Sequence, residues 1–366
     1  MISTREKPEP STYNEHLISP ARQVAFDVLL QVYSGAYADD LLRERSATLE
    51  SRDAGLASEI VFGCLRYQAQ LDYLIGRFVP SRIDPEVRIA LRMGIYQLRY
   101  LDRIPAHAAV GESVELVKRA KKRSASGLVN AVLRKVDRDP VAWPDRATEL
   151  SAPSWLVERW DRKYGPEITD RIAAEFLKPA ETHIAATGRI QDIGAQAVVP
   201  MLDLRPGLTM LDLCAAPGNK TAQAVTYGVR PVACDIHWHR LKPMHELNCE
   251  RVVLDGTKDL PFLEQFDRVL VDAPCSGTGT LGRNPEIKWR LKPSDLISLH
   301  RKQVALLRIG LQQLKPGGRL VYSTCSLEDE ENQLVLQAVP GSWQVTERVP
   351  GREEGDGFFI AVLTSN

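Results

Sequence analysis

Residues 268–279 have the sequence RVLVDAPCSGTG, in which a short apolar run ends at an acid and leads into a small, polar turn that carries Cys275. Residues 319–326, RLVYSTCS, repeat this arrangement around Cys325. A short apolar run bounded by turn residues is typical of a buried strand. Open α/β sheets bind their ligands beyond the carboxyl ends of the strands. We therefore expect both thiols to face one pocket.

A third stretch, residues 211–221 with the sequence LDLCAAPGNKT, is predicted to begin as a strand and to end as a helix that Gly218 opens. A glycine lets the backbone approach a ligand closely, and the free N–H groups of a helix start attract a carboxylate or a phosphate. The stretch lacks the G-x-G-x-x-G spacing that is typical of a dinucleotide site, so NAD is not favoured.

Three aspartates, Asp235, Asp255 and Asp272, end three successive predicted strands. Each alone is an ordinary acid at a loop start, but their repetition along one rim favours a ligand site. Asp235 lies 17 residues after Gly218 and suits the hydroxyls of a ribose. Asp272 suits an ammonium, and the helix start at Gly218 suits a carboxylate. These groups together predict S-adenosylmethionine as the cofactor rather than a dinucleotide.

The pattern of apolar residues changes character along the chain. Residues 21–139 have helical spacing almost throughout and predict an all-α bundle, whereas short β-rich runs alternate with helices from residue 189 onward. This alternation predicts an α/β, Rossmann-like, mostly parallel sheet. The expected strands are residues 210–214, 232–235, 252–255, 268–272 and 319–323, with a helix at 296–314 and a closing antiparallel pair at 343–346 and 358–363. The expected domains are a disordered leader (1–19), the helical domain (20–140), a linker with a short helical subdomain (141–188) and the α/β domain (189–366).

Composition excludes several classes of function. Lys plus Arg and Asp plus Glu number 47 each, so overall charge gives no indication of nucleic acid; the basic run at 118–138 suits either phosphate binding or a solvated helix face. The six cysteines form no Cys-x-x-Cys pair, which predicts no metal site. No apolar run approaches the roughly 20 residues of a membrane helix. We expect a cytoplasmic monomer, because no export signal or coiled-coil pattern is present.

A lone cysteine at a strand end is more often a small buried hydrophobe than a nucleophile. Cys275 and Cys325 differ from that pattern because each lies among small polar turn residues on the expected ligand face. A thiolate that adds to C6 of a pyrimidine makes C5 able to accept a methyl group from a sulfonium, and an acid such as Asp272 near N3 assists this step. The thiol pair therefore predicts a covalent pyrimidine methyltransferase.

The three motifs together resemble the RNA cytosine-5 methyltransferases, and specifically the bacterial RsmB/Sun (Fmu) type of ribosomal RNA enzyme. That type joins a NusB-like helical domain to a class I methyltransferase domain. Residues 128–135 (LVNAVLRK) resemble the end of the NusB-like domain. The resemblance implies that Cys325 attacks a cytosine of small-subunit (16S) ribosomal RNA and that Cys275 assists product release. It also implies that Asp235 binds the ribose, Asp255 the adenine side, and Asp272 the methionine amino group or the target base. The residues implied to surround the methionine part are Cys214, Ala215, Ala216, Pro217, Gly218, Asn219 and Lys220.

The chain departs from the family pattern at two places. Asn219 stands where this type usually has Gly, and the family has a longer stretch before residues 191–192 than the few residues around 183–188 found here. That stretch helps to shape the RNA groove, so the target nucleotide stays open. Two other classes of function are alternatives: a class I methyltransferase for a small molecule or a protein, which needs no paired thiols, and a non-catalytic RNA-binding factor, for which degenerate cysteine motifs are expected.

Overall fold

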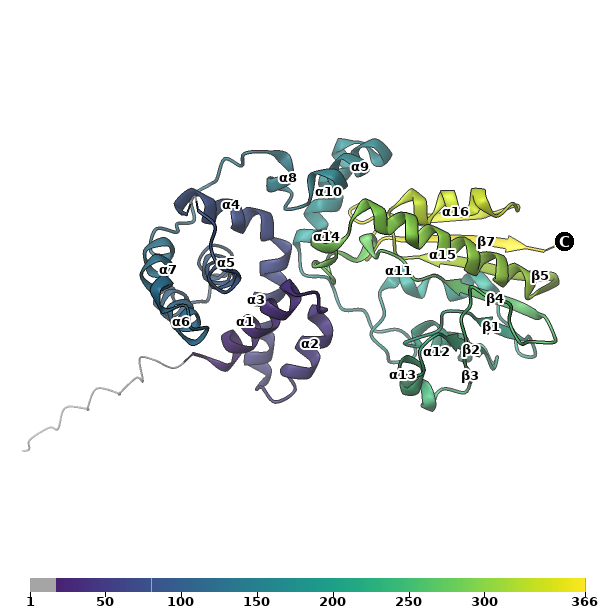
Figure 1. Cartoon of the computed structure of the whole chain (residues 1–366). Coiled ribbons are helices and arrows are strands. Elements are labelled where there is room, and N and C mark those ends of the chain that lie inside the picture. Colours follow the sequence, from purple (N-terminus) through teal and green to yellow (C-terminus); the bar gives the residue numbers. More distant parts are fainter. Residues whose placement is uncertain (1–17, 80, 366) are drawn as a thin grey trace, which may run out of the picture. The chain divides into compact units, whose positions relative to one another are not determined.

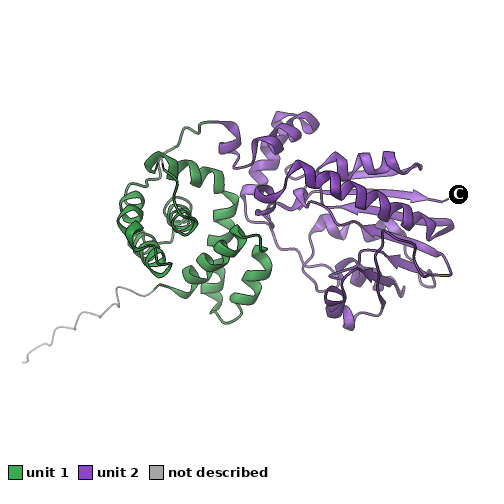
Figure 2. Ribbon diagram, in the orientation of Figure 1, with its two compact units in different colours: residues 1–144 green, residues 145–366 purple. Residues whose placement is uncertain are grey.

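The computed structural model describes residues 18–79 and 81–365 and forms two compact units, residues 1–144 and 145–366 (Figure 2). The expected disordered leader, residues 1–19, lies almost entirely outside the described residues. At its end, Ser19 is the N-cap residue that precedes the first helix, and its amide and hydroxyl both donate to Glu112, at 2.8 and 2.7 Å.

The first unit is the predicted all-α bundle. Its helices pack around one apolar core that includes Phe26, Ile60 and Leu116. Gly63 allows two of these helices to approach closely, because a Cβ at this position would lie 1.9 Å from the ring of Tyr96. The helices are α1 (Pro20–Tyr33), α2 (Ala38–Arg45), α3 (Ser51–Arg66), α4 (Gln68–Phe78), α5 (Pro85–Tyr100), α6 (Ala106–Arg119), η1 (Arg123–Ala125) and α7 (Ser126–Leu133).

The second unit contains a seven-stranded sheet with the order β3-β2-β1-β4-β5-β7-β6 (Figure 1). All neighbours pair in parallel except β5–β7 and β6–β7, which form the antiparallel closing pair, so the predicted fold class is confirmed. The strands are β1 (Met210–Asp212), β2 (Val232–Asp235), β3 (Glu250–Val253), β4 (Phe266–Asp272), β5 (Leu314–Thr324), β6 (Gln344–Arg348) and β7 (Phe358–Thr364).

Helices and loops cover the two faces of this sheet, and alternation along each strand decides which face a side chain meets. Val269 and Val271 face the layer that contains α15, whereas Leu270 faces the layer that contains η2 and α12. The helices of this unit are α8 (Arg146–Glu149), α9 (Ser154–Tyr164), α10 (Pro166–Leu177), α11 (Ile193–Gln196), η2 (Val199–Leu202), α12 (Asn219–Val225), α13 (Trp238–Leu241), η3 (Lys242–Glu246), η4 (Thr278–Thr280), α14 (Ile287–Arg290), α15 (Pro293–Gln312), η5 (Asp329–Glu331) and α16 (Gln333–Ala338).

Several predicted boundaries are displaced; β1, for example, ends at Asp212 rather than at residue 214. The helix expected at 296–314 is α15, which ends at Gln312, and β5 already begins at Leu314. Residues 315–318 therefore lie within the strand, where the pairing of β4 with β5 is irregular between Phe266 and Arg268. The strand expected at 252–255 is β3, which ends at Val253, so Asp255 lies two residues beyond the strand.

The order of the strands reverses between β1 and β4. From β1 the chain builds outward through β2 to β3, and it then returns to place β4 on the other side of β1. Such a switch point opens a crevice at the carboxyl ends of the two strands, which is where ligands bind in sheets of this class. Asp212 and Asp272 end these two strands and therefore stand at this crevice.

Candidate active site

The two motif cysteines meet at the ends of neighbouring strands. Asp272 of β4 is in register with Ser323 of β5, so the loops that follow both strands leave the sheet side by side. The Sγ atoms of Cys275 and Cys325 lie 3.3 Å apart, and neither cysteine forms a disulfide. The contact with Cys325, together with burial, raises the pKa of the Cys275 thiol well above its usual value. The protonated thiol is therefore the favoured form of Cys275.

Lys220 supplies a positive charge beside this pair. Its Nζ lies 2.6 Å from Oδ2 of Asp272, whose Oδ1 accepts a hydrogen bond of 2.7 Å from the hydroxyl of Ser323. Burial alone would lower the pKa of Lys220, but the charge of Asp272 outweighs it, and negative charge on Cys325 raises that pKa further. Lys220 and Cys325 line the same cavity, so the Lys220 ammonium is the positive charge available to an anion formed there.

Two adjoining cavities share a wall formed by Cys214, Ala216, Asp272 and Cys325. The larger, of about 400 Å³, is lined by apolar side chains such as Leu254 and Leu306 and by polar ones. Seven other predicted site residues line these two cavities. The larger cavity is lined by Asp235, Asp255 and Cys275. The smaller cavity, of about 250 Å³, is lined by Ala215, Pro217, Asn219 and Lys220. All predicted site residues except Gly218 therefore lie around one crevice.

Gly218 lies within the loop 214–220 but, in the part of the chain that the structure describes, it lines neither of the two cavities. Its φ of 102° is left-handed, and a Cβ there would lie 2.7 Å from Cγ of Met244. The position therefore requires glycine both for its backbone conformation and for space. The loop then continues into α12.

The two outer acids of the larger cavity are already hydrogen bonded. Asp235 accepts from the amide of His237 at 2.9 Å and lies 3.1 Å from Nη1 of Arg240. Asp255 accepts from the amide and the hydroxyl of Thr257, at 3.0 and 2.6 Å, which lowers the pKa of its carboxyl. Both side chains are thus oriented as acceptors at the rim of the cavity.

Asp212 ends β1 in the floor of the smaller cavity and is fully buried. Its Oδ2 accepts from the hydroxyl of Thr221 at 2.7 Å, whereas its Oδ1 is buried without a hydrogen-bond partner in the structure. Burial raises the pKa of this carboxyl to about 7. A buried acceptor that faces a cavity and has no donor fits a ligand that brings one.

This pKa predicts a pH-dependent stability. Because the pKa of Asp212 is raised from its usual value of 3.8 to about 7 in the folded protein, its contribution to the free energy of unfolding is fully present below pH 4 and is lost as the pH rises through about 7. Relative to wild type, Asp212→Asn is expected to gain stability with rising pH between 4 and 8, by at most about 4 kcal/mol. Urea unfolding of the ligand-free protein measures this difference. Asp267→Asn is the matched control, because hydrogen bonds from Thr209 lower the pKa of Asp267 to about 2. The change in the free energy of unfolding caused by Asp267→Asn should therefore be nearly constant over this pH range. A pH-independent difference between Asp212→Asn and wild type would contradict the prediction.

Sequence reasoning missed the far wall of the smaller cavity. Arg283 bridges Asp192 and Asp356 at 3.0 and 2.7 Å, and burial raises the pKa of Asp356 to about 6. Phe358 lines the same cavity and lies 5.3 Å from Nζ of Lys220. These residues come from the segment before β1, from the loop between η4 and α14 and from the chain around the start of β7, and only the fold brings them to the motif loops.

The basic run of the helical unit is largely paired with acids. Lys118 contacts Glu115 at 2.7 Å, and Arg119 contacts Asp27 at 2.9 Å. Further ion pairs join Lys122 to Asp84 and Arg138 to Asp102. The run is thus in good part a set of surface ion pairs, and phosphate binding by it stays a prediction.

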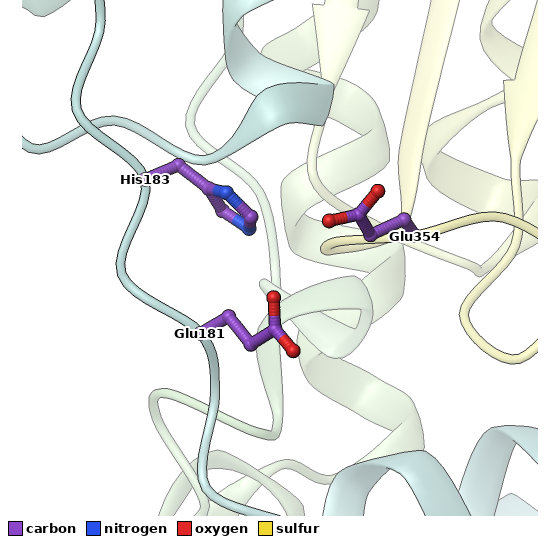
Figure 3. Close-up of side chains that lie close together, drawn as sticks. All are labelled: Glu181, His183 and Glu354. Atoms are coloured by element: carbon purple, nitrogen blue, oxygen red, sulfur yellow. The ribbon is translucent and has the colours of Figure 1, made fainter.

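One group of potential metal ligands was not anticipated. The side chains of Glu181, His183 and Glu354 point toward one another, with ligand atoms within 4.8 Å (Figure 3). Both glutamates are exposed, and the guanidinium of Arg283 donates to the carbonyl of Glu181 at 2.6 Å. A neighbouring positive charge opposes the binding of a cation, so we assign no metal to this group.

The chain is similar to proteins of known families. Residues 199–340 match the model of the 16S rRNA methyltransferase RsmB/F family, and residues 19–138 match the NusB family. The probable ribosomal RNA small subunit methyltransferase B of Bacillus subtilis is 32% identical, with 87% of each chain covered. The chain belongs to the RsmB/F family of ribosomal RNA methyltransferases.

Other relatives of this RsmB-family protein cover still more of it. The ribosomal RNA small subunit methyltransferase B of Vibrio cholerae is 33% identical over 426 positions, with 95% of this chain and 98% of the relative covered. That alignment is longer than the 366-residue chain, so the relative contains residues that this chain lacks. The crystal structure of PH0851 has the same fold, with a TM-score of 0.77 over 95% of this chain and 99% of the other at 21% identity.

A helix that crosses a bilayer needs about 20 mostly apolar residues. None of the helices within residues 18–79 and 81–365 is long and apolar enough to cross a membrane.

Proposed function

We propose that this RsmB-family protein methylates C5 of a cytosine in 16S ribosomal RNA, with S-adenosylmethionine as the methyl donor and with Cys325 as the covalent nucleophile. The observation that carries the proposal is the thiol pair, whose sulfur atoms lie 3.3 Å apart beside Lys220 at the switch point of the sheet. A class I methyltransferase for a small molecule has no use for this pair. A non-catalytic RNA-binding factor has no use for the adjoining cavities.

The residues around the two cavities fit S-adenosylmethionine. Asp235 offers a carboxylate to ribose hydroxyls, and Leu254 and Leu306 offer apolar walls to an adenine ring next to Asp255. On the other side of the shared wall, the unpartnered Oδ1 of Asp212 offers an acceptor to an ammonium. When bound, the cofactor supplies a methyl group on a positively charged sulfur. The loop 214–220 would hold its methionine part.

Cys325 performs the step that activates the base. As a thiolate, its sulfur adds to C6 of the cytosine, and the electrons of the C5–C6 double bond make C5 nucleophilic. Lys220 stabilises the thiolate before attack, and Asp272 is held by Lys220 and Ser323 in position to contact the base or the cofactor. After C5 is methylated, a water molecule accepts the C5 proton, the electrons of the C–H bond re-form the C5–C6 double bond, and the C6–S bond breaks to release the Cys325 thiolate. Cys275, in contact with the departing sulfur, assists this release.

Bisulfite mapping of 16S ribosomal RNA tests the proposal. A strain that lacks the gene is expected to lose protection at one cytosine, and the purified enzyme with S-adenosylmethionine is expected to restore it as 5-methylcytidine. Identical maps in the two strains, or incorporation of labelled methyl groups into metabolites instead of RNA, would contradict it.

A further inference from the structure

Glu331 places a fully buried carboxylate between the two cysteine loops. Its Oε1 accepts hydrogen bonds from the amide of Ser276 at 2.8 Å and from Nε2 of Gln303 at 3.0 Å. Its Oε2 accepts from the hydroxyls of Ser276 and Ser326. An ionised carboxylate has about four acceptor positions, and here all four are used by uncharged donors.

Each of the bridged serines directly follows a motif cysteine. Ser276 follows Cys275 in the loop after β4, and Ser326 follows Cys325 in the loop after β5. Gln303 of α15 also donates to the carbonyl of Pro274, the residue before Cys275, at 3.0 Å. Glu331 thus joins the two short segments whose sulfur atoms touch.

The backbone around Glu331 is itself anchored to β5. The hydroxyl of Tyr322 donates to the carbonyl of Glu331 at 2.6 Å. The side chain of Asn332 accepts from the hydroxyl of Thr324 at 2.6 Å and donates to the carbonyl of Ser326 at 2.8 Å. The carboxylate therefore reaches the Cys275 loop from a fixed base on the Cys325 strand.

We propose that Glu331 is a positioning residue for the thiol pair: by bridging Ser276 and Ser326, it holds Cys275 against Cys325 in the arrangement that covalent catalysis needs. The inference rests on the proposed function, because that function gives the thiol contact its purpose. The bridge itself is a property of the folded protein, so it can be tested without RNA or cofactor.

The charge of Glu331 adds a second, separable effect. The pKa of the Cys275 thiol is raised by its contact with Cys325 first, then by burial, then by negative charge on Cys325 and on Glu331. Glu331 thereby favours the protonated form of Cys275. A variant that keeps the bridge but loses the charge should let the pair ionise at lower pH.

Two substitutions separate the bridge from the charge. Glu331→Gln keeps the shape: its oxygen replaces Oε1, and its amide donates to the two serine hydroxyls, which accept hydrogen bonds as readily as they donate them. Glu331→Ala removes the bridge altogether. Glu328→Gln and Glu328→Ala are the matched controls, because Glu328 is also buried but is held by Arg159 at 2.8 Å and Trp160 at 3.1 Å.

Disulfide formation in the full-length protein reports the distance between the thiols. With diamide as the oxidant, the two sulfur atoms form one bond, and two protons and two electrons pass to the N=N bond of diamide, which becomes a hydrazine. Peptide mapping follows the Cys275–Cys325 product over a range of pH. We expect Glu331→Ala to form it about tenfold more slowly than wild type, because loops that separate by about 1 Å lose contact geometry. We expect Glu331→Gln to stay within about threefold, with its pH profile shifted to lower pH.

Turnover on 16S ribosomal RNA gives the second readout. Glu331→Ala is expected to lower kcat by about 100-fold with little change in KM for RNA, and Glu331→Gln is expected to recover most of that loss. The Glu328 variants should match wild type in disulfide formation even where they lower the unfolding temperature.

The outcomes separate the two proposals. Wild-type rates and pH profiles in both Glu331 variants, with only a lowered unfolding temperature, would overturn the positioning role. If Glu331→Ala does not fold, Ser326→Ala, which removes one arm of the bridge, decides in its place, and a wild-type rate of disulfide formation in that variant overturns the inference. If disulfide formation responds as expected but the wild-type enzyme methylates no cytosine, the proposed function fails while the bridge stands.

Discussion

Cys325→Ala is expected to lower methyl transfer to 16S ribosomal RNA by at least about 1,000-fold, because without the thiolate C5 of cytosine is not activated. The small, partly exposed side chain makes little contribution to the core, so folding should be unaffected. Binding of S-adenosylmethionine should also persist, since the acids and apolar walls of the larger cavity remain. Filter binding of methyl-labelled RNA measures the rate, and calorimetry measures cofactor affinity.

Cys249→Ala is the matched control for this substitution. Cys249 is likewise free and partly buried, but it contributes to neither of the two cavities described around the thiol pair. It should therefore retain wild-type turnover. Residual activity of Cys325→Ala above about a tenth of wild type would show that another group attacks the base.

Cys275→Ala is expected to show the opposite behaviour, in that it still forms the covalent complex with RNA but fails to release it. The attacking sulfur and Lys220 remain in place, whereas the thiol 3.3 Å from the departing sulfur is gone. Turnover should fall by about 100-fold, the size of effect that a single positioned acid–base group contributes. A stable complex with ordinary RNA and cofactor should accumulate on a denaturing gel.

The same gel gives the control for this second prediction. Wild type should show little complex with unmodified RNA, and the double variant Cys275→Ala/Cys325→Ala should show none. If Cys275→Ala accumulates no complex and turns over at the wild-type rate, Cys275 has no part in release.

Much of this fold follows from local sequence. Apolar runs that end in Asp235 and Asp272 predict strands and place these acids at the carboxyl edge of a parallel sheet. The same reasoning placed the two cysteines on neighbouring strand ends. It was less accurate for Asp255, because β3 pairs from Glu250 onward in register with β2 and ends before that acid.

What the sequence does not reveal is the set of contacts between distant segments. Glu331 lies in an acidic run, residues 328–331, that has the composition of a solvated surface, yet it is fully buried against a loop 55 residues away. Arg283 similarly joins Asp192 to Asp356 across 91 and 73 residues. Such pairings depend on how the chain crosses the sheet, which neither periodicity nor spacing encodes.

The central claim is that the sulfur of Cys325 bonds to C6 of the target base. RNA that contains 5-fluorocytosine tests it directly, because a fluorine at C5 cannot be removed as a proton and the adduct persists. Incubation of wild type with this RNA and S-adenosylmethionine, followed by proteolysis and mass spectrometry of the cross-linked peptide, identifies the bonded residue. We predict a nucleotide on Cys325 in wild type and in Cys275→Ala; a nucleotide on Cys275, or no adduct from an enzyme that methylates normal RNA, would contradict the account.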